Sequence, residues 1–372
     1  MMQYLPLIER SEPVVQQSPF PYQGPLAPDA LRGRDRLLAD LTRRVTERRV
    51  TALLGPRRYG KTSVLDRLAH DLPEVATVAV DLYGIQSIAD AVTRFDDALA
   101  NSPGPFKDET SAISAKVGIH LGAVRAEFAR PRRNQPDPSA RLSQLLDVFL
   151  DVAARVPTLL ILDEFSDIGN APGTAALLRS KFQRHYHRFG LLFAGSHVST
   201  MRALFADREQ PFYGQADLVT IGPLDATTIA EILRDGFWAT DRSPGTVAGR
   251  IHQLTAGHPQ RTMFLADAAW RHTPVGGDGD EGWGHALASA RQALDPTMRF
   301  FYDHLTSGEQ RTLRLVAHEE PLHGAAASRL RLTAGSTTHA YRQLMVRGHL
   351  HDDGTFVDPL FADWFRHTLP LT

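Results

Sequence analysis

The segment Gly55–Ser63, with the sequence Gly-Pro-Arg-Arg-Tyr-Gly-Lys-Thr-Ser, constrains the fold of this chain more than any other. An apolar run, Val50–Leu54, precedes it, and a helical pattern begins at Thr62. A glycine-rich turn between a strand and a helix lets successive backbone N–H groups converge on an anion, and the helix N-terminus adds a positive partial charge. The spacing G-x-x-x-x-G-K-[ST] in this setting therefore predicts a phosphate-binding loop on a parallel sheet.

The side chains of this loop indicate which phosphates it suits. Lys61 offers a full positive charge to β and γ oxygens, so we class it as catalytic as well as nucleotide-binding. The Thr62 hydroxyl is a suitable oxygen ligand for Mg²⁺. We expect ATP or ADP with Mg²⁺ to bind through these residues: Gly55, Pro56, Arg57, Arg58, Tyr59, Gly60, Lys61, Thr62 and Ser63.

Strand-like and helical segments alternate around the loop. The predicted strands are 50–54, 75–82, 158–162 and 191–194, and the predicted helices between them include 62–72 and 88–99. Such alternation builds a parallel sheet with helices on both faces, so we expect an α/β fold. The proline-rich segment 101–138 interrupts the alternation, and we interpret it as an insertion.

Two of the predicted strands end in polar residues. Asp163 and Glu164 follow the apolar strand 158–162, and Ser196 and His197 follow strand 191–194. Asp163 would hold the magnesium shell through water, and Glu164 would polarise the water that attacks the γ-phosphate. Ser196 is the candidate for sensing the γ-phosphate, with His197 as the alternative.

Composition limits the classes of partner. The formal net charge of −1 over 372 residues provides no bulk positive field for nucleic acid, so binding of DNA would need a local patch. The absence of cysteine excludes disulfides and Cys-based zinc sites and fits a reducing cytoplasm, where we expect the protein. The apolar runs are shorter than a membrane span, so we expect no membrane partner.

We divide the chain into four parts. Residues 1–30 are rich in proline and read as an extended arm outside the main core, and residues 31–222 form the phosphate-binding core. Residues 223–295 form a helical lid, in which Ser243 is expected to cap a helix and 276–282 to be a flexible loop. Residues 296–372 form a C-terminal module.

Several short motifs together resemble the archaeal-type ATPases of the STAND and AAA+ assemblage. Besides the loop, they are Asp81–Tyr83, Leu162–Phe165, Ala194–Ser196 and Gly257–Pro259, and the match covers about residues 31–271. The resemblance implies an ASCE-type, AAA+-like parallel sheet with an α-helical lid. It also implies hydrolysis of ATP to ADP and phosphate.

The resemblance implies roles for three residues outside the loop. Arg34 corresponds to a box that lies near the adenine in relatives. His258 matches a lid histidine of the Gly-His-Pro motif that touches bound phosphate, and Arg261 lies where related ATPases carry a sensor arginine.

One position departs from the family pattern. Gln215 stands where many relatives keep a candidate arginine finger, so we expect slow turnover. Three arginines are alternatives among which the sequence does not choose: Arg184, Arg188 and Arg208.

The C-terminal module resembles a winged helix. Helical patterns at 308–313, 325–330 and 336–347 are followed by a hairpin whose turn is Asp353-Gly354. The third helix is expected to point these residues outward, toward DNA: Thr337, Thr338, His339, Arg342 and Arg347. Asp352 and Asp353 on the wing would repel a phosphate backbone, so DNA binding and a latch or protein-contact role both stay open.

The leading interpretation is an ATP-driven molecular switch, in which ATP orders the lid and the winged helix against the core. One alternative is a DNA-binding or DNA-remodelling ATPase of a mobile-element or defence system. Another is an interaction module that holds nucleotide with little hydrolysis. The partner stays open among a second copy of the chain, another protein and DNA.

Overall fold

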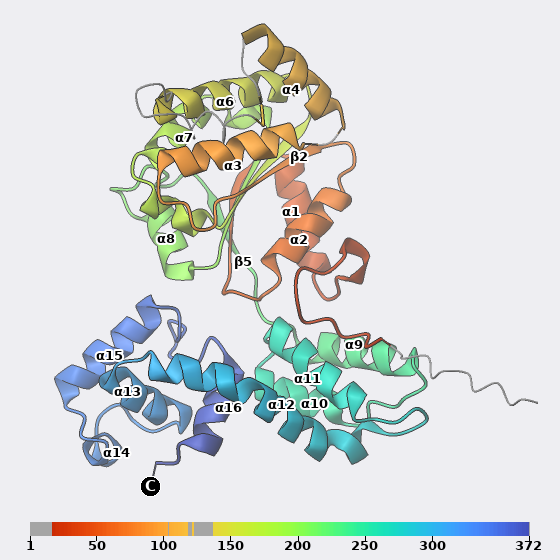
Figure 1. The fold of residues 1–372 in the computed structure, drawn as a ribbon, viewed down its shortest axis with the longest axis vertical. Helices are drawn as coiled ribbons and strands as arrows, with labels where there is room; N and C mark the ends of the chain where they lie inside the picture. Colours follow the sequence, from red (N-terminus) through yellow and green to blue (C-terminus); the bar gives the residue numbers. More distant parts are fainter. Residues whose placement is uncertain (1–16, 103, 118–120, 123–136, 372) are drawn as a thin grey trace, which may run out of the picture.

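The computed structural model describes residues 17–102, 104–117, 121–122 and 137–371. Its centre is a parallel five-stranded sheet with the strand order β2-β3-β4-β1-β5 (Figure 1). The strands are β1 (Val50–Leu54), β2 (Ala76–Asp81), β3 (Thr158–Asp163), β4 (Gly190–Gly195) and β5 (Asp217–Thr220). The four predicted strands are present, and β5 is an additional edge strand.

Helices cover both faces of the sheet, as the alternation predicted. On β3, Leu159 and Ile161 pack with helices α1 (Asp35–Thr46) and α2 (Lys61–His70). Leu160 and Leu162 point to the other face. That face packs against α3 (Ile88–Ala100), α6 (Pro138–Ala153), α7 (Thr174–Phe182) and α8 (Val198–Ala206). Successive residues of a buried parallel strand thus enter two separate apolar clusters.

The segment interpreted as an insertion begins with a packed helix, α4 (Gly104–Val117). Phe106 is fully buried, and its ring lies 6.0 Å from that of Phe149 on α6. The first part of the insertion is therefore part of the helical layer. Residues 118–120 and 123–136 lie outside the described part of the chain.

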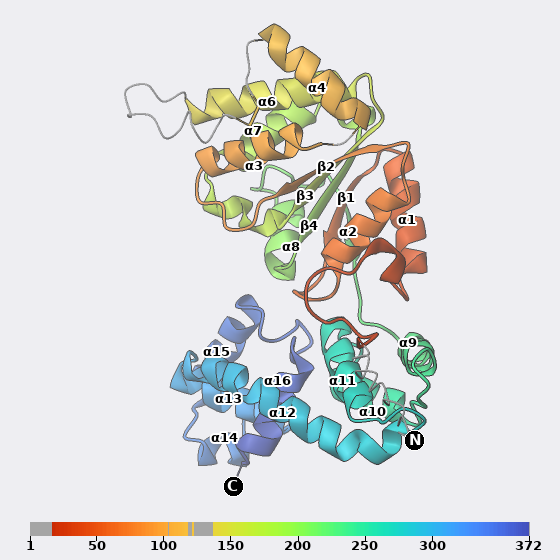
Figure 2. The same ribbon diagram turned by 45° about the vertical axis from the view of Figure 1, so that its right-hand side comes forward.

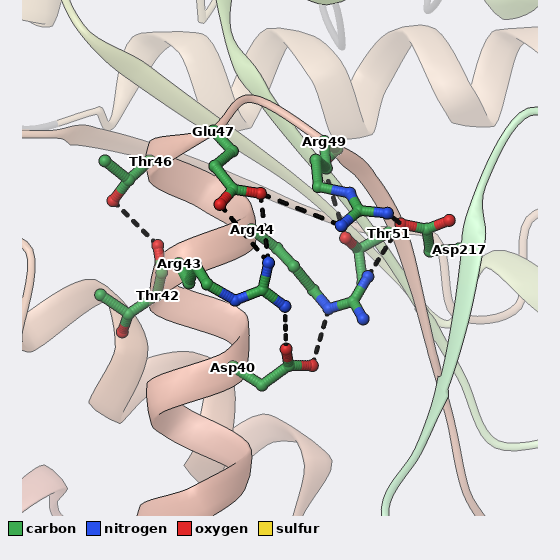
Figure 3. Close-up of polar contacts among 9 residues, drawn as sticks. All are labelled: Asp40, Thr42, Arg43, Arg44, Thr46, Glu47, Arg49, Thr51 and Asp217. Atoms are coloured by element: carbon green, nitrogen blue, oxygen red, sulfur yellow. Dashed lines mark hydrogen bonds and ion pairs between the residues drawn. The ribbon is translucent and has the colours of Figure 1, made fainter.

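An ion-pair network ties the edge strand β5 to α1 (Figure 3). The Arg44 guanidinium donates to Asp40 at 2.7 Å and to Asp217, the first residue of β5, at 2.8 Å. Arg49 also pairs with Asp217. These contacts hold the start of β5, two residues after Gln215, against α1.

The segment predicted to be a lid contains α9 (Ala226–Trp238), α10 (Val247–Thr255) and α11 (Pro259–Arg271). The predicted cap at Ser243 is wrong, because α10 begins at Val247 and the Ser243 hydroxyl donates instead to Asp278 at 2.8 Å. The predicted loop 276–282 is also partly wrong. Asp278 caps α12 (Gly279–Asp303), so the second half of that segment is helical.

The C-terminal segment continues directly from the lid. Helix α12 runs through the expected boundary at residue 295, with Pro296 inside it. Helices α13 (Ser307–Ala317), α14 (Ala325–Arg329) and α15 (Ala334–Val346) follow, and α16 (Pro359–Thr368) ends the fold. Leu350 and Phe356 form an antiparallel bridge around the predicted Asp353-Gly354 turn. The lid and the C-terminal helices share one apolar cluster, and Figures 1 and 2 show α9 to α16 together beyond the carboxyl edge of the sheet.

The outward face predicted for α15 is partly wrong. Thr337 is fully buried, and its hydroxyl donates to the Thr333 carbonyl one turn earlier. His339 and Arg342 are exposed, Thr338 is half-buried, and Arg347, also exposed, pairs with Glu309.

The described part of the N-terminal arm is packed, contrary to the expectation that it lies outside the core. Phe20 is 1% exposed and stacks 5.6 Å from Phe237 of α9. The Leu26 N–H donates to the Ser63 hydroxyl at 2.9 Å. The arm thus connects the lid to the first helix after the phosphate loop. Within the described ranges, no helix is long and apolar enough to cross a membrane.

Candidate nucleotide site

The loop Gly55–Ser63 joins the end of β1 to the start of α2, as the motif requires. Gly55 is needed sterically, because a Cβ there would lie 2.1 Å from Ile221 Cγ2. Gly60 has φ +85°, a left-handed conformation that favours glycine, at the entry to α2. Arg58 also has positive φ, +67°, so the loop carries one strained non-glycine residue.

Lys61 is buried inside this loop. Its Nζ donates to the carbonyls of Gly55 and Pro56 at 2.8 and 3.0 Å. Burial lowers the pKa of the ammonium, while the charges of Glu164 and Asp163 oppose that shift. A dianionic phosphate beside Lys61 would add a further charge that favours the protonated amine.

Thr62 and Asp163 come together from α2 and β3. The Thr62 hydroxyl lies 3.4 Å from Asp163 Oδ2. Burial raises the pKa of Asp163, so the isolated carboxylate is poorly compensated for its lost hydration. Two hard oxygen donors, one of them an under-compensated carboxylate, fit the ligand preference of Mg²⁺.

Glu164 and Ser196 also meet, from the ends of β3 and β4. Glu164 Oε2 accepts hydrogen bonds from the Ser196 hydroxyl at 2.6 Å and from its N–H at 3.1 Å. The Glu164 backbone has φ +48°. His197, the alternative sensor, instead places Nδ1 3.4 Å from the Ser166 hydroxyl. Of the two, Ser196 is the one that contacts the candidate base.

Arg34 supports the loop from the N-terminal side. Its guanidinium donates to the Gly222 carbonyl at 2.9 Å and to the Tyr59 carbonyl at 3.4 Å. Burial lowers its pKa, with Tyr59 and Asp225 opposing the shift. Arg34 lines the cavity described below, and it links the loop to the start of the lid.

His258 caps helix α11. Its Nδ1 accepts from the Arg261 N–H at 3.4 Å, and its ring packs edge-on to Tyr59 at 4.9 Å. Burial lowers the pKa of His258 to about 4, so the imidazole is neutral at pH 7. The structure thus places His258 against the phosphate loop through Tyr59.

Arg261 lies on α11 and is held by the C-terminal segment. Its Nε donates to both oxygens of Asp358 at 2.9 and 3.0 Å, and its terminal nitrogen makes a further short contact with Oδ2. Arg261 is 3% exposed. The expected sensor arginine is therefore occupied by a carboxylate 97 residues away in the sequence.

A cavity of about 1010 Å³ brings these groups together. It lies between the loop, the lid and the N-terminal arm, and its lining includes Arg34, Lys61, Glu164 and Arg261. That volume falls at the upper end for small-ligand sites. The arm supplies an apolar wall that sequence reasoning missed. The aromatic residue Tyr22, inside a proline-rich segment, was the one signal that pointed to it.

Three of the arginine-finger candidate positions lie near the amino ends of the strands, away from the phosphate loop at the carboxyl end of β1. Gln215 is two residues before β5, and Arg184 and Arg188 come before β4. Because all five strands are parallel, the strand starts lie together at one end of the sheet, and the phosphate loop lies at the other end. Arg208 is exposed in the connection from α8 to β5.

Comparison with known proteins finds similarity in structure. No family model matches the sequence, and no curated protein matches it. A Walker-type ATPase of Pyrococcus abyssi is similar with a TM-score of 0.67 at 17% identity, covering 94% of this chain and 99% of that chain. The ORC2 protein of Aeropyrum pernix, in ADPNP and ADP complexes, has a TM-score of 0.50 at 15% identity, covering 87% and 83%.

At these identities the similarity concerns the fold. The chain has an α/β fold with a parallel five-stranded sheet, and it shares this fold with these two structures. The predicted α/β fold with a parallel sheet is confirmed, and the helical lid and the winged helix stay predictions.

Proposed function

We propose that this chain binds and hydrolyses ATP and acts as a nucleotide-dependent switch. The observation that carries the proposal is the Arg261–Asp358 ion pair, which joins the wall of the nucleotide cavity to the C-terminal module. A guanidinium prefers bidentate oxyanion partners, and a phosphate competes with a carboxylate for the same fork. The arginine can therefore exchange Asp358 for a bound phosphate.

The hydrolytic part rests on residues from three strand ends. Lys61 and the loop N–H groups would hold the phosphates, and Thr62 with Asp163 would hold Mg²⁺. Bound Mg²⁺ would neutralise phosphate charge as it develops. Glu164 would orient and deprotonate the attacking water, with Ser196 fixing the carboxylate.

The switching part rests on how the C-terminal module meets the core. Asp358 precedes α16, and Asp352 in the hairpin pairs with Arg202 of α8. The charges of Asp358 and Asp353 also act on Tyr59, whose pKa is raised mainly by burial. The hairpin thus directs its acidic residues at the loop and at α8. Loss of the Arg261 contact on ATP binding would remove one of these attachments.

DNA binding is the second candidate. The order of α13, α14 and α15 followed by a hairpin supports the winged-helix proposal, and His339 and Arg342 are exposed on α15. The ion pair between Asp352 and Arg202 favours the switch, because it turns the hairpin toward the core. Stimulation of turnover by duplex DNA, lost with rising salt, would instead favour DNA binding.

The test compares Asp358→Asn with Arg261→Ala. Because Asp358→Asn frees the arginine for phosphate, the variant should bind a non-hydrolysable ATP analogue more tightly than wild type, by about 10-fold or more. Arg261→Ala should bind it more weakly. Arg291 of α12, which pairs with Asp363 on α16, gives a matched control as Arg291→Ala. Equal affinity in wild type and Asp358→Asn would refute the competition.

A further inference from the structure

Arg57, the third residue of the phosphate loop, has a contact that phosphate binding by the loop backbone does not require. Its side chain is exposed, and its guanidinium carbon lies 5.3 Å from the centroid of the Tyr83 ring. Arg57 lines the same cavity as Lys61 and Glu164. An arginine over an aromatic face is attracted by the ring quadrupole, so Tyr83 fixes where this cation lies.

Tyr83 is held as a rigid platform. Its N–H donates to Asp81 Oδ1 at 2.9 Å, and its carbonyl accepts from Arg94 at 3.1 Å. The next N–H, of Gly84, donates to Asp167 Oδ2 at 2.8 Å. The ring itself is 53% exposed. These hydrogen bonds fix the backbone of Tyr83, and its exposed ring is free to hold a cation because the ring is not part of the apolar core.

Tyr83 follows the strand that pairs with β3, the strand that leads to Asp163 and Glu164. Asp81 pairs in register with Asp163, and the Leu82 N–H donates to the Asp163 carbonyl at 3.0 Å. Tyr83 therefore follows directly on the strand next to the one that ends in Asp163 and Glu164. Arg57 reaches from the loop after β1 to this position.

The other cations of the cavity are engaged or face elsewhere. Arg34 donates to two carbonyls, and Arg261 pairs with Asp358. Arg58 acts toward the lid, where it adds to the burial that lowers the pKa of His258. Among the described residues, no carboxylate pairs with Arg57.

We propose that Arg57 is the catalytic cation for the transferred phosphoryl group, supplied within the same chain, and that Tyr83 is its positioning residue. The proposal rests on the proposed ATPase function and deepens it. It also explains why a neutral residue, Gln215, can occupy the candidate arginine-finger position. A chain that carries its own cation at the loop needs none from a neighbouring subunit.

In the proposed hydrolysis step, Arg57 has no redox or acid–base role. The water oxygen forms a bond to the γ-phosphorus as the bond to the bridging oxygen breaks, and ADP leaves with the electron pair. Glu164 takes the water proton. Arg57 stays protonated throughout, and it offsets the charge on the peripheral γ oxygens as that charge is redistributed.

Binding of a transition-state mimic tests this without relying on turnover. We would titrate Mg²⁺ and ADP with and without aluminium fluoride, using wild type, Arg57→Ala, Arg57→Lys and Tyr83→Ala. Aluminium fluoride should tighten the binding of Mg²⁺ and ADP to wild type. In Arg57→Ala that gain should fall by about 100-fold or more, because one preorganised transition-state donor is lost. Affinity for ADP alone should change less than about 3-fold, since ADP lacks the γ oxygens that the Arg57 side chain would contact.

Variants of Tyr83 test its positioning role separately. Tyr83→Ala should lose part of the gain and Tyr83→Phe should keep it, because the ring face holds the cation. Tyr213→Ala, another exposed tyrosine at 43%, is the matched control and should keep the full gain. Arg57→Lys should recover only part, since a point charge lacks the planar fork. Free guanidinium ion should raise single-turnover rates in Arg57→Ala.

Three results would overturn the proposal. If Arg57→Ala keeps the full fluoride-dependent gain, Arg57 is not the cation, while the ATPase proposal stands. If the gain depends on protein concentration and disappears in Arg208→Ala, the cation comes from a neighbour. A wild type that binds ADP with no gain from fluoride would contradict the hydrolytic function itself, and the role of Arg57 with it.

Discussion

Glu164 accepts two hydrogen bonds from Ser196, one from the hydroxyl at 2.6 Å and one from the backbone N–H at 3.1 Å. The two residues end neighbouring strands, β3 and β4, so the sheet itself sets their separation. The backbone of Glu164 is left-handed, with φ +48°, a conformation that costs about 1–3 kcal/mol outside glycine and asparagine. The strained backbone and the two hydrogen bonds from Ser196 together hold the Glu164 carboxylate in one orientation after the end of β3.

Replacing this acid should separate binding from turnover. Glu164→Gln should bind ATP like wild type but lower kcat by about 10²–10⁴-fold, because only the proton acceptor is lost. Ser196→Ala should cost less, about 10-fold, since it misplaces the base without removing it. Single-turnover rates and nucleotide titrations with both variants check this. Wild-type kcat in Glu164→Gln would place the base elsewhere.

Loss of the loop lysine should abolish tight nucleotide binding. Lys61→Ala removes the charge expected on the β and γ oxygens, and we expect affinity for ATP to fall by at least about 100-fold. Lys181, which pairs with Asp147 away from the cavity, is the matched control as Lys181→Ala. Calorimetric titration measures both. Micromolar affinity retained in Lys61→Ala would refute the assignment of the loop.

The sequence was enough to predict the strands at the centre of the sheet. Residues 52–54 and 159–162 are uninterrupted apolar runs, and a near-continuous apolar run is typical of a buried parallel strand. Strand β5 has four residues that alternate in burial and include Asp217 and Thr220, so no apolar run marks it. Its pairing with β1 and the contact of Asp217 with Arg44 hold it in place, and both are tertiary effects.

The long-range contacts were beyond local patterns. Arg261 and Asp358 are far apart in sequence, and each fitted a different motif. Thr337 looked like an exposed polar residue, but helix α15 turns it inward, where its hydroxyl bonds to a carbonyl one turn earlier. Ser243 had the chemistry of a cap, yet Asp278 takes its hydroxyl. Polar side chains of this kind have several partners, and only the packed fold selects one.

The pKa of His258 predicts a loss of stability in acid. The fold lowers it from 6.5 to about 4, so the unfolded chain binds more protons between these values. The free energy of unfolding should therefore be intact above pH 6.5 and fall as pH drops toward 4, by at most about 3 kcal/mol from this residue.

The variant His258→Asn isolates this effect, because asparagine also caps helices and does not titrate. Urea unfolding of wild type and variant between pH 7 and 4 measures the difference. The raised pKa of Asp163 affects both proteins alike and cancels. An identical decline in the two proteins would show that His258 does not drive it.

The arm should contribute to stability as well as to the cavity. Phe20→Ala removes a buried ring that packs on Phe237 and lies where a Gly236 side chain would be, 2.5 Å from an added Cβ. We expect a loss of about 3–5 kcal/mol in the free energy of unfolding, from lost burial and the cavity left behind. Phe300→Ala, at a 60% exposed phenylalanine, is the control and should change little. Chemical denaturation reads both variants.

The most direct test of the switch is a distance measurement between core and C-terminal module. The chain has no cysteine, so Glu74→Cys and His339→Cys, both at exposed positions, give a single pair of spin-label sites. With ADP, we predict one distance distribution. With a non-hydrolysable ATP analogue, the distribution should shift, and adding Asp358→Asn should produce the same shift without nucleotide. A distribution that is identical with ADP, with the analogue and in Asp358→Asn would contradict the account.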